Sequence, residues 1–242
     1  MLISVIIPVY NAAPFVRDAV ESALAQPETA EVILVEDGSP DDSLAICTAL
    51  AAEYDCVKLY RHPDGENRGA GASRNLGIIN STSDYIAFLD ADDVYLPGRF
   101  CVAERMLEAD PTLDGVYEAI GLEIDSQTGW LRWQSARRST NALYTITTQI
   151  SPEQLFDALI RGGVGFFTVN GLTVRRSIFN KTGLYDEHLR LHQDHIMNFK
   201  MAAVARLAPG RLEEAVATYR IHENNRISAP RPQWQVYSAR MK

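Results

Sequence analysis

The stretch YIAFLDADD, residues 85–93, is an apolar run that ends in three closely spaced aspartates. Residues 85–89 are too few for a helix of ordinary length and predict a strand. Ligands of open α/β sheets bind beyond the carboxyl ends of the strands. The sequence therefore places Asp90, Asp92 and Asp93 where a ligand is expected.

Short apolar runs alternate with helical patterns in the residues before this stretch. Strands are predicted at residues 5–9, 31–35 and 57–60, and helices at residues 14–24, after Ser39-Pro40 and around residues 72–79. This alternation is typical of a parallel sheet covered by helices. We therefore expect an α/β fold with a mostly parallel central sheet.

The residues after the stretch are less regular. A helix is predicted from Leu96-Pro97 onward, one long strand at residues 115–124, a helix that begins at Ser151-Pro152 and a last helix at residues 192–207. Residues 130–138 mix aromatic residues with arginines and residues 139–148 show no clear period, so both are interpreted as a hairpin or loop. No repeat and no Pro-, Gly- or Ser-rich linker divides the chain, which predicts one continuous domain.

Composition excludes several classes of protein. The 242 residues are 46% hydrophobic and carry a net charge of −8, so the chain can bury a core and lacks the basic surface that binds nucleic acid. Its three cysteines, Cys47, Cys56 and Cys101, form no CxxC pair, which disfavours a disulfide framework or a zinc site and predicts reduced, buried packing residues. No segment reaches the roughly 20 apolar residues of a membrane span, and a cytoplasmic location is the simplest expectation.

Polar residues follow three of the predicted strands. Tyr10-Asn11 follows the first strand, Asp37-Gly38-Ser39 the second, and the aspartates of residues 90–93 the strand at 85–89. Any one of these residues alone is an ordinary turn or helix-capping residue. Crowded carboxylates repel one another unless a cation offsets their charge, so together they indicate a site for Mg²⁺ or Mn²⁺. The first strand is followed by neither a P-loop nor a GxGxxG motif, so the sequence supports neither a P-loop phosphotransferase nor a Rossmann dehydrogenase.

Four motifs in this order resemble the family 2 glycosyltransferases, which have the GT-A fold. They are VIIPVYN at residues 5–11, VEDGS at 35–39, NRG at 67–69 leading to SRN at 73–75, and LDADD at 89–93. TGLYDE at 182–187, HQDH at 192–195 and YRIH at 219–222 resemble the acceptor side of the family. The resemblance implies one domain over residues 1–242, with a Rossmann-like nucleotide-sugar-binding half at 1–110, an acceptor-side half at 111–228 and a tail at 229–242.

The resemblance also implies roles for individual residues. Pro8, Tyr10, Asp37, Arg74 and Asp92 would bind the nucleotide-sugar donor. Asp92, Asp93 and His222 would hold the metal, and Arg226 follows His222 on the same loop. Asp90 could hold these acids in place without contacting the metal itself. Because Asp37 and Arg74 are predicted on the rim of the sheet rather than on an apolar face, their substitution is expected to weaken donor binding without unfolding the protein.

Asp194 is the residue expected to act as general base. It matches the second acid of an acidic pair in the family, and Gln193 replaces the first acid. Without the resemblance, Asp194 would be read as a surface acid near a helix N-terminus. His222 could equally be a solvated histidine after a strand.

The resemblance implies a metal-dependent, inverting transferase that uses Mn²⁺ or Mg²⁺ and carries the DXD motif. It would move a hexosyl or N-acetylhexosaminyl group from a uridine diphosphate donor to a glycan or lipid-linked acceptor in polysaccharide biosynthesis. Two alternatives remain at this stage. One is a sugar-phosphate nucleotidyltransferase, which would require a Gly- and Lys-containing loop after the first strand. The other is a catalytically silent subunit that only binds nucleotide-sugar, which the presence of Gln193 would allow.

Two further segments have less specific patterns. Trp130 and Trp133, with Arg132, Arg137 and Arg138, could form an acceptor platform or pack as an ordinary hairpin. The tail at residues 230–242 carries three basic residues and no acid, so it could contact an anionic membrane surface, or it could be a frayed terminus.

Overall fold

A seven-stranded sheet forms the centre of the protein, and the computed structural model describes residues 1–137, 143–189 and 191–223. Its strands lie in the order β10-β6-β9-β4-β1-β2-β3. Their bounds are β1 Ile3–Val9, β2 Thr29–Glu36, β3 Val57–Arg61, β4 Tyr85–Phe88, β6 Gly115–Tyr117, β9 Leu172–Arg175 and β10 Leu207–Pro209. Only β9 runs antiparallel to its neighbours, so the prediction of a mostly parallel sheet is confirmed.

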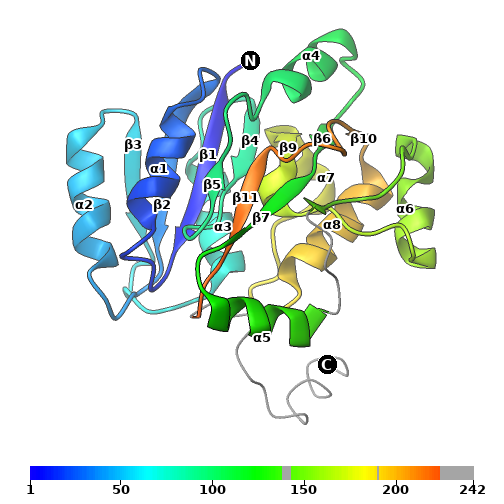
Figure 1. The fold of residues 1–242 in the computed structure, drawn as a ribbon. Coiled ribbons are helices and arrows are strands. Elements are labelled where there is room, and N and C mark those ends of the chain that lie inside the picture. The colour runs from blue at the N-terminus through cyan, green and yellow to red at the C-terminus, as the bar shows by residue number, and fades with distance from the viewer. Residues whose placement is uncertain (138–142, 190, 224–242) are drawn as a thin grey trace.

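Helices cover both faces of this sheet (Figure 1). Helices α1 (Val16–Leu24) and α2 (Ser43–Glu53) pack against one face, and α3 (Ala70–Asn80) and α8 (Gln193–Val204) against the other. A hydrophobic core lies on each face of the sheet, and alternate residues of β1 point into the two cores. Val5 and Ile7 lie in the core on the α1 side, and Ile6 lies in the core on the α3 side. This alternation follows from the period of two along a strand.

A second sheet of four strands lies beside the first. It has the order β5-β11-β7-β8, with bounds β5 Val94–Tyr95, β7 Ile120–Ile124, β8 Leu143–Tyr144 and β11 Ala217–Ile221. The remaining helices are α4 Cys101–Ala109, α5 Gln127–Arg137, α6 Pro152–Arg161, η1 Val169–Gly171, η2 Arg176–Ile178 and α7 Phe179–Thr182.

Two predictions about local structure were wrong. The long strand expected at residues 115–124 is two strands in different sheets, because the backbone amides of Glu118 and Ala119 leave the ladder and donate to Gly171 and Arg211. The segment 130–148 was expected to be a hairpin or loop, but its first part, residues 130–137, lies in helix α5, in which Trp133 is buried against Tyr219.

The described residues bear on several other expectations. None of their helices is long and apolar enough to cross a membrane. The expectation of three buried cysteines holds for Cys47 but was wrong for Cys101, which is exposed, and Cys56 is half-buried. The predicted tail at residues 229–242 lies outside the described residues, as do Arg138, Arg226 and the side chains of Arg132 and Arg137.

Candidate active site

A pocket of about 770 Å³ opens at the carboxyl ends of β1, β2 and β4. The loops that follow these strands form one side of it, and α8 and the segment before β9 form the other. Helix α5 lies at the same end of the molecule (Figure 1). Its Trp133 is one of the residues that line the pocket. The predicted site residues that line the pocket are Pro8, Tyr10, Asp37, Arg74, Asp90, Asp92, Asp194 and His222.

Asp92 and His222 line the pocket and contact each other. His222 Nε2 lies 3.1 Å from Asp92 Oδ2, and its ring packs on Phe15 with a centroid separation of 4.5 Å. The histidine follows β11, which is 130 residues from Asp92 in the sequence. The structure therefore brings together two of the three predicted metal-binding residues.

The third predicted metal-binding residue, Asp93, lies beneath the pocket rather than in its wall. The side chain is 1% exposed, and both of its oxygens accept hydrogen bonds: Oδ1 from the backbone amide of Arg220 at 2.8 Å and Oδ2 from Asn170 Nδ2. Burial and the nearby Asp92 and Asp90 carboxylates raise the pKa of Asp93 well above its ordinary value. Asp93 thus differs from Asp92, because each of its oxygens accepts from a protein donor and the residue does not line the pocket.

Arg74 bridges two carboxylates in the pocket. Its Nη1 donates to Asp194 Oδ1 at 2.6 Å and its Nη2 donates to Asp90 Oδ1 at 2.7 Å. The side chain of Arg74 is 3% exposed, whereas those of Asp90 and Asp194 are 35% and 40% exposed. Burial and the carboxylates of Asp194 and Asp92 raise the pKa of Asp90 to about 6, although Arg74 opposes this shift. Arg74 therefore lines the pocket at the rim of the sheet, as predicted, and its guanidinium is buried there as the partner of two acids.

Asp194 lies in the first turn of α8. The residue before the helix, His192, has a left-handed backbone with φ 62°, and Gln193 Nε2 donates to the carbonyl oxygen of Leu189. A Cβ atom at Gly71 would lie 3.1 Å from Cδ of Gln193, so the glutamine packs directly on α3. Gln193 therefore anchors the start of α8 through an amide donor that an ionised acid would lack.

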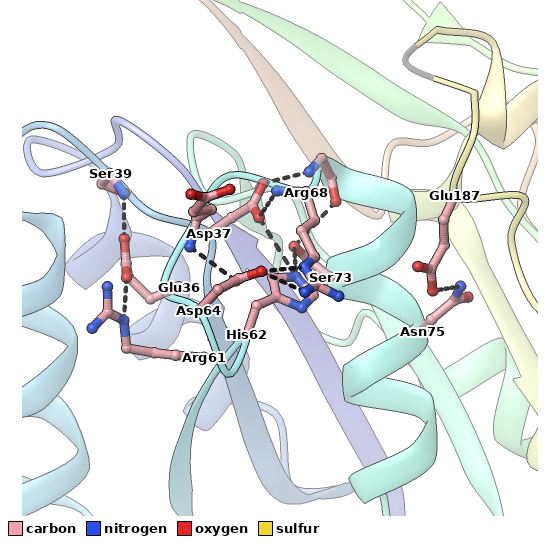
Figure 2. Close-up of polar contacts among 12 residues, drawn as sticks. Glu36, Asp37, Ser39, Arg61, His62, Asp64, Arg68, Ser73, Asn75 and Glu187 are labelled. Carbon is pink, nitrogen blue, oxygen red and sulfur yellow. Dashed lines mark hydrogen bonds and ion pairs between the residues drawn. The ribbon is translucent and has the colours of Figure 1, made fainter.

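Asp37 holds the loop that leads into α3 (Figure 2). Its Oδ1 accepts from the backbone amide of Arg68 at 2.7 Å and its Oδ2 from that of Gly69 at 2.8 Å. The residue is 2% exposed, although it contributes to the pocket wall. Asp37 therefore lies at the rim of the sheet, as predicted, but it is buried beneath two backbone amides rather than open to solvent.

Tyr10 stands at the mouth of the pocket and is 52% exposed. The next residue, Asn11, has φ 53°, and its amide donates to Ser39 Oγ. The amide of Ala13 donates to Asp41 Oδ2 at 2.9 Å, which fixes the loop after β1 against the loop after β2. This arrangement leaves the aromatic face of Tyr10 available to a planar ligand.

Several pocket residues were not predicted from the sequence. Asn170 is 1% exposed and joins the aspartate turn to η1, and its only signal in the sequence is a polar residue within the apolar run 166–174. Phe166 and His195 stack in the wall beside Asp194, with ring centroids 4.5 Å apart. Of the predicted platform, Trp133 lines the pocket but is 3% exposed, and Trp130 is not among the lining residues.

The donor set of the pocket fits a divalent cation that the ligand helps to hold. Among the described residues, no group of three or more His, Cys, Asp or Glu side chains is arranged to bind a metal ion by itself. Asp92 and His222 provide one carboxylate and one imidazole, and Mg²⁺ or Mn²⁺ sites are often completed by substrate phosphates.

Comparisons with known proteins agree with this geometry. The family model for glycosyl transferase family 2 matches residues 4–183. The succinoglycan biosynthesis protein ExoU of Rhizobium meliloti is 34% identical over 195 residues, which are 80% of this chain and 54% of that protein. The chain spans between 28% and 59% of the length of four other curated relatives, all uncharacterized glycosyltransferases of Rickettsia species.

Solved structures share the fold at low sequence identity. TarS 1–349 of S. aureus in complex with UDP-GlcNAc has a TM-score of 0.69 and 18% identity, over 99% of this chain and 64% of that one. The mannosyltransferase PcManGT of Pyrobaculum calidifontis in complex with GDP-Man and Mn²⁺ has a TM-score of 0.63 and 17% identity, over 92% and 58% of the two chains. With a family model that matches about three quarters of its residues, the chain belongs to glycosyl transferase family 2.

Proposed function

We propose that the protein is an inverting glycosyltransferase that moves a sugar from a uridine diphosphate donor to an acceptor hydroxyl. The observation that carries this proposal is the position of Asp194. Its carboxylate is held by the buried Arg74 in the same pocket as the Asp92–His222 pair. A base and a diphosphate-binding group therefore face one cavity that is large enough for a nucleotide-sugar.

The donor would bind on the side of the pocket formed by the loops after β1 and β2. Tyr10 offers an aromatic face for the base, and Pro8 and Asp37 line the wall beside it. We assign Asp37 to holding this wall in shape through Arg68 and Gly69, and Arg74 to positioning the acids beneath the diphosphate. TarS, with the same fold, is known in complex with UDP and with UDP-GlcNAc, which supports a uridine nucleotide here.

Asp92 and His222 would hold Mn²⁺ or Mg²⁺ together with the diphosphate of the donor. A bound cation would offset the negative charge that develops on the departing diphosphate. The complex of PcManGT with GDP-Man and Mn²⁺ supports this assignment.

Asp194 would accept the proton of the acceptor hydroxyl as its oxygen attacks the anomeric carbon. Oδ1 is engaged by Arg74, and Oδ2 accepts no hydrogen bond from the described residues, so it is the oxygen available to the acceptor. Arg74 fixes the orientation of the carboxylate and remains protonated, because the Asp194 and Asp90 charges raise its pKa against the effect of burial. Attack from the side opposite the diphosphate would invert the configuration of the sugar.

The acceptor half would be formed by residues 111–228, with Phe166 and His195 beside Asp194 as apolar contacts for the acceptor. The likeness to a succinoglycan biosynthesis protein supports a polysaccharide acceptor, which could be lipid-linked.

A screen of nucleotide-sugars tests this function. The purified protein is incubated with UDP- and GDP-sugars in the presence of Mn²⁺, and release of the nucleoside diphosphate is measured with and without a chelator. We expect release from a UDP-sugar that depends on Mn²⁺ and is lost in Asp92→Asn. Release that is unaffected by the chelator, or absent with every donor while UDP still binds, would contradict the proposal and favour a subunit that only binds the donor.

A further inference from the structure

Asn170 contacts both ends of the turn that carries the pocket aspartates. Its Oδ1 accepts a hydrogen bond from the backbone amide of Asp90 at 3.1 Å, and its Nδ2 donates to Asp93 Oδ2 at 2.5 Å. The turn is closed internally by the amide of Asp93, which donates to the carbonyl of Asp90 at 3.0 Å. One buried side chain therefore spans the segment from which Asp92 projects into the pocket.

Asn170 is itself held by a fully buried ion pair. Arg99 Nε donates to the carbonyl oxygen of Asn170 at 3.1 Å, and Arg99 Nη1 donates to Glu118 Oε2 at 2.9 Å. The side chains of Arg99 and Glu118 are both 0% exposed. Removing one partner of such a pair would leave an uncompensated buried charge, which is strongly unfavourable, so Arg99 is fixed in the position from which it donates to Asn170.

Asp93 completes the arrangement on the other side. Its Oδ1 accepts from the amide of Arg220 in β11, two residues before His222. Asp93 thus connects the aspartate turn to the strand that delivers the histidine. Each polar atom of the Asn170 and Asp93 side chains takes part in one of these hydrogen bonds.

We infer that Asn170 and Asp93 are positioning residues that form a clamp, and that this clamp sets Asp92 and His222 at the spacing that a divalent cation requires. This inference rests on the proposed function for the identity of the cation. It also assigns to Asp93 a role beneath the metal site instead of a direct contact with the metal. Residues that orient metal ligands in this way typically change metal affinity 10- to 100-fold when they are substituted.

Exchanging the two side chains tests the inference. In Asn170→Asp, two carboxylates face each other, and in Asp93→Asn, two amide donors do. In the double variant Asn170→Asp/Asp93→Asn, residue 170 can accept from the Asp90 amide and from the new amide at 93, whose oxygen can accept from Arg220. The exchange therefore restores every hydrogen bond and leaves the net charge of the protein unchanged.

Two readouts are measured on the four proteins. The first is the affinity for Mn²⁺ in the presence of UDP, by calorimetry, where each single variant should lose about tenfold or more and the double variant should return to within about threefold of the parent. The second is hydrogen–deuterium exchange of the Asp90 and Arg220 amides without any ligand. Exchange should be faster in the single variants and slow again in the double variant.

Thr173→Val is the matched control, because Thr173 is 0% exposed on the neighbouring strand β9 and is not a pocket residue. It should leave both readouts unchanged. Loss of Mn²⁺ affinity in the double variant equal to that in Asp93→Asn would overturn the inference, because the carboxylate at 93 would then be needed at the metal itself. Parent-like exchange in both single variants would also overturn it. If the parent bound neither Mn²⁺ nor UDP, the proposed function would fail, and the ligand-free exchange data alone would decide on the clamp.

Discussion

Arg74 Nη1 lies 2.6 Å from Asp194 Oδ1 and so joins α3 to the first turn of α8 across 120 positions of sequence. The contact connects the half of the chain that would bind the nucleotide with the half that carries the proposed base. Arg74 also donates to Asp90 through Nη2. Among the described residues, it is the only side chain that donates to both Asp90 and Asp194.

Arg74→Lys should lower kcat for transfer by about 10- to 100-fold and change UDP affinity by much less. Lysine keeps the positive charge but cannot place two donors on two carboxylates at once, so Asp194 loses its fixed orientation. Steady-state kinetics and UDP calorimetry measure the two effects separately. Arg68→Lys, on an exposed arginine of the preceding loop, serves as control. Equal losses in UDP affinity and in kcat would instead indicate that Arg74 contacts the donor.

Asp37→Ala should destabilise the fold by about 2–4 kcal/mol, because two buried backbone amides, those of Arg68 and Gly69, lose their acceptors. Urea denaturation measures the change in the free energy of unfolding. Asp42→Ala, which removes an exposed acid, should stay within about 0.5 kcal/mol of the parent. If Asp37→Ala were as stable as the parent but bound UDP more weakly, this prediction would be wrong, and Asp37 would instead contact the donor directly.

Gln193→Glu should reduce stability by about 1–2 kcal/mol and should not raise the transfer rate. A carboxylate at this position would face the carbonyl oxygen of Leu189, to which the glutamine amide now donates. Denaturation and transfer assays on the same preparation measure both effects, with the exposed Gln154→Glu as control. A gain in transfer would mean that the family's acidic pair is functionally missing here.

Glu31→Gln tests the pH dependence of stability. Burial raises the pKa of Glu31, but hydrogen bonds from Ser4 and Thr82 outweigh it, and the pKa lies below its ordinary value. A carboxyl with a lowered pKa stabilises the fold above its unfolded pKa of about 4.3, and this stabilisation disappears as the pH falls through the lower folded value.

The parent should therefore exceed Glu31→Gln in the free energy of unfolding by about 1 kcal/mol at pH 7, and the difference should shrink below about pH 4. Urea denaturation at pH 7, 5 and 3.5 follows it. Glu66→Gln, on an exposed loop, should show no such dependence. A difference that stayed constant down to pH 3.5 would show that the charge of Glu31 contributes nothing.

The sequence predicts the first strands and helices of the chain well, because each of them has an apolar pattern with the period of a strand or of a helix. Strand β1 and helix α1 carry clear apolar patterns, and strand ends of a parallel sheet necessarily share one edge. The break between β6 and β7 could not be predicted, because Glu118 leaves the sheet to meet Arg99, a residue that is 19 positions away. Helix α5 was missed because its apolar residues form no single stripe.

The candidate site could be predicted only as a set of residue types. Asp92, His222 and Asp194 were expected in one pocket, and the structure places them there. Which acid is exposed and which is buried depends on contacts between distant segments, such as Asn170 with Asp93 at 77 positions. No local pattern in one sequence contains that information.

Asp194→Asn is the measurement that tests the central claim most directly. Asparagine keeps an oxygen that can accept from Arg74 but cannot take a proton, so UDP and Mn²⁺ should still bind within a few-fold of the parent while transfer falls by about 10²- to 10⁴-fold. Asp186→Asn, on an exposed acid of the preceding loop, should transfer at the parent rate. If Asp194→Asn also transfers sugar near the parent rate, another group takes the proton and the assignment of Asp194 as the base is wrong.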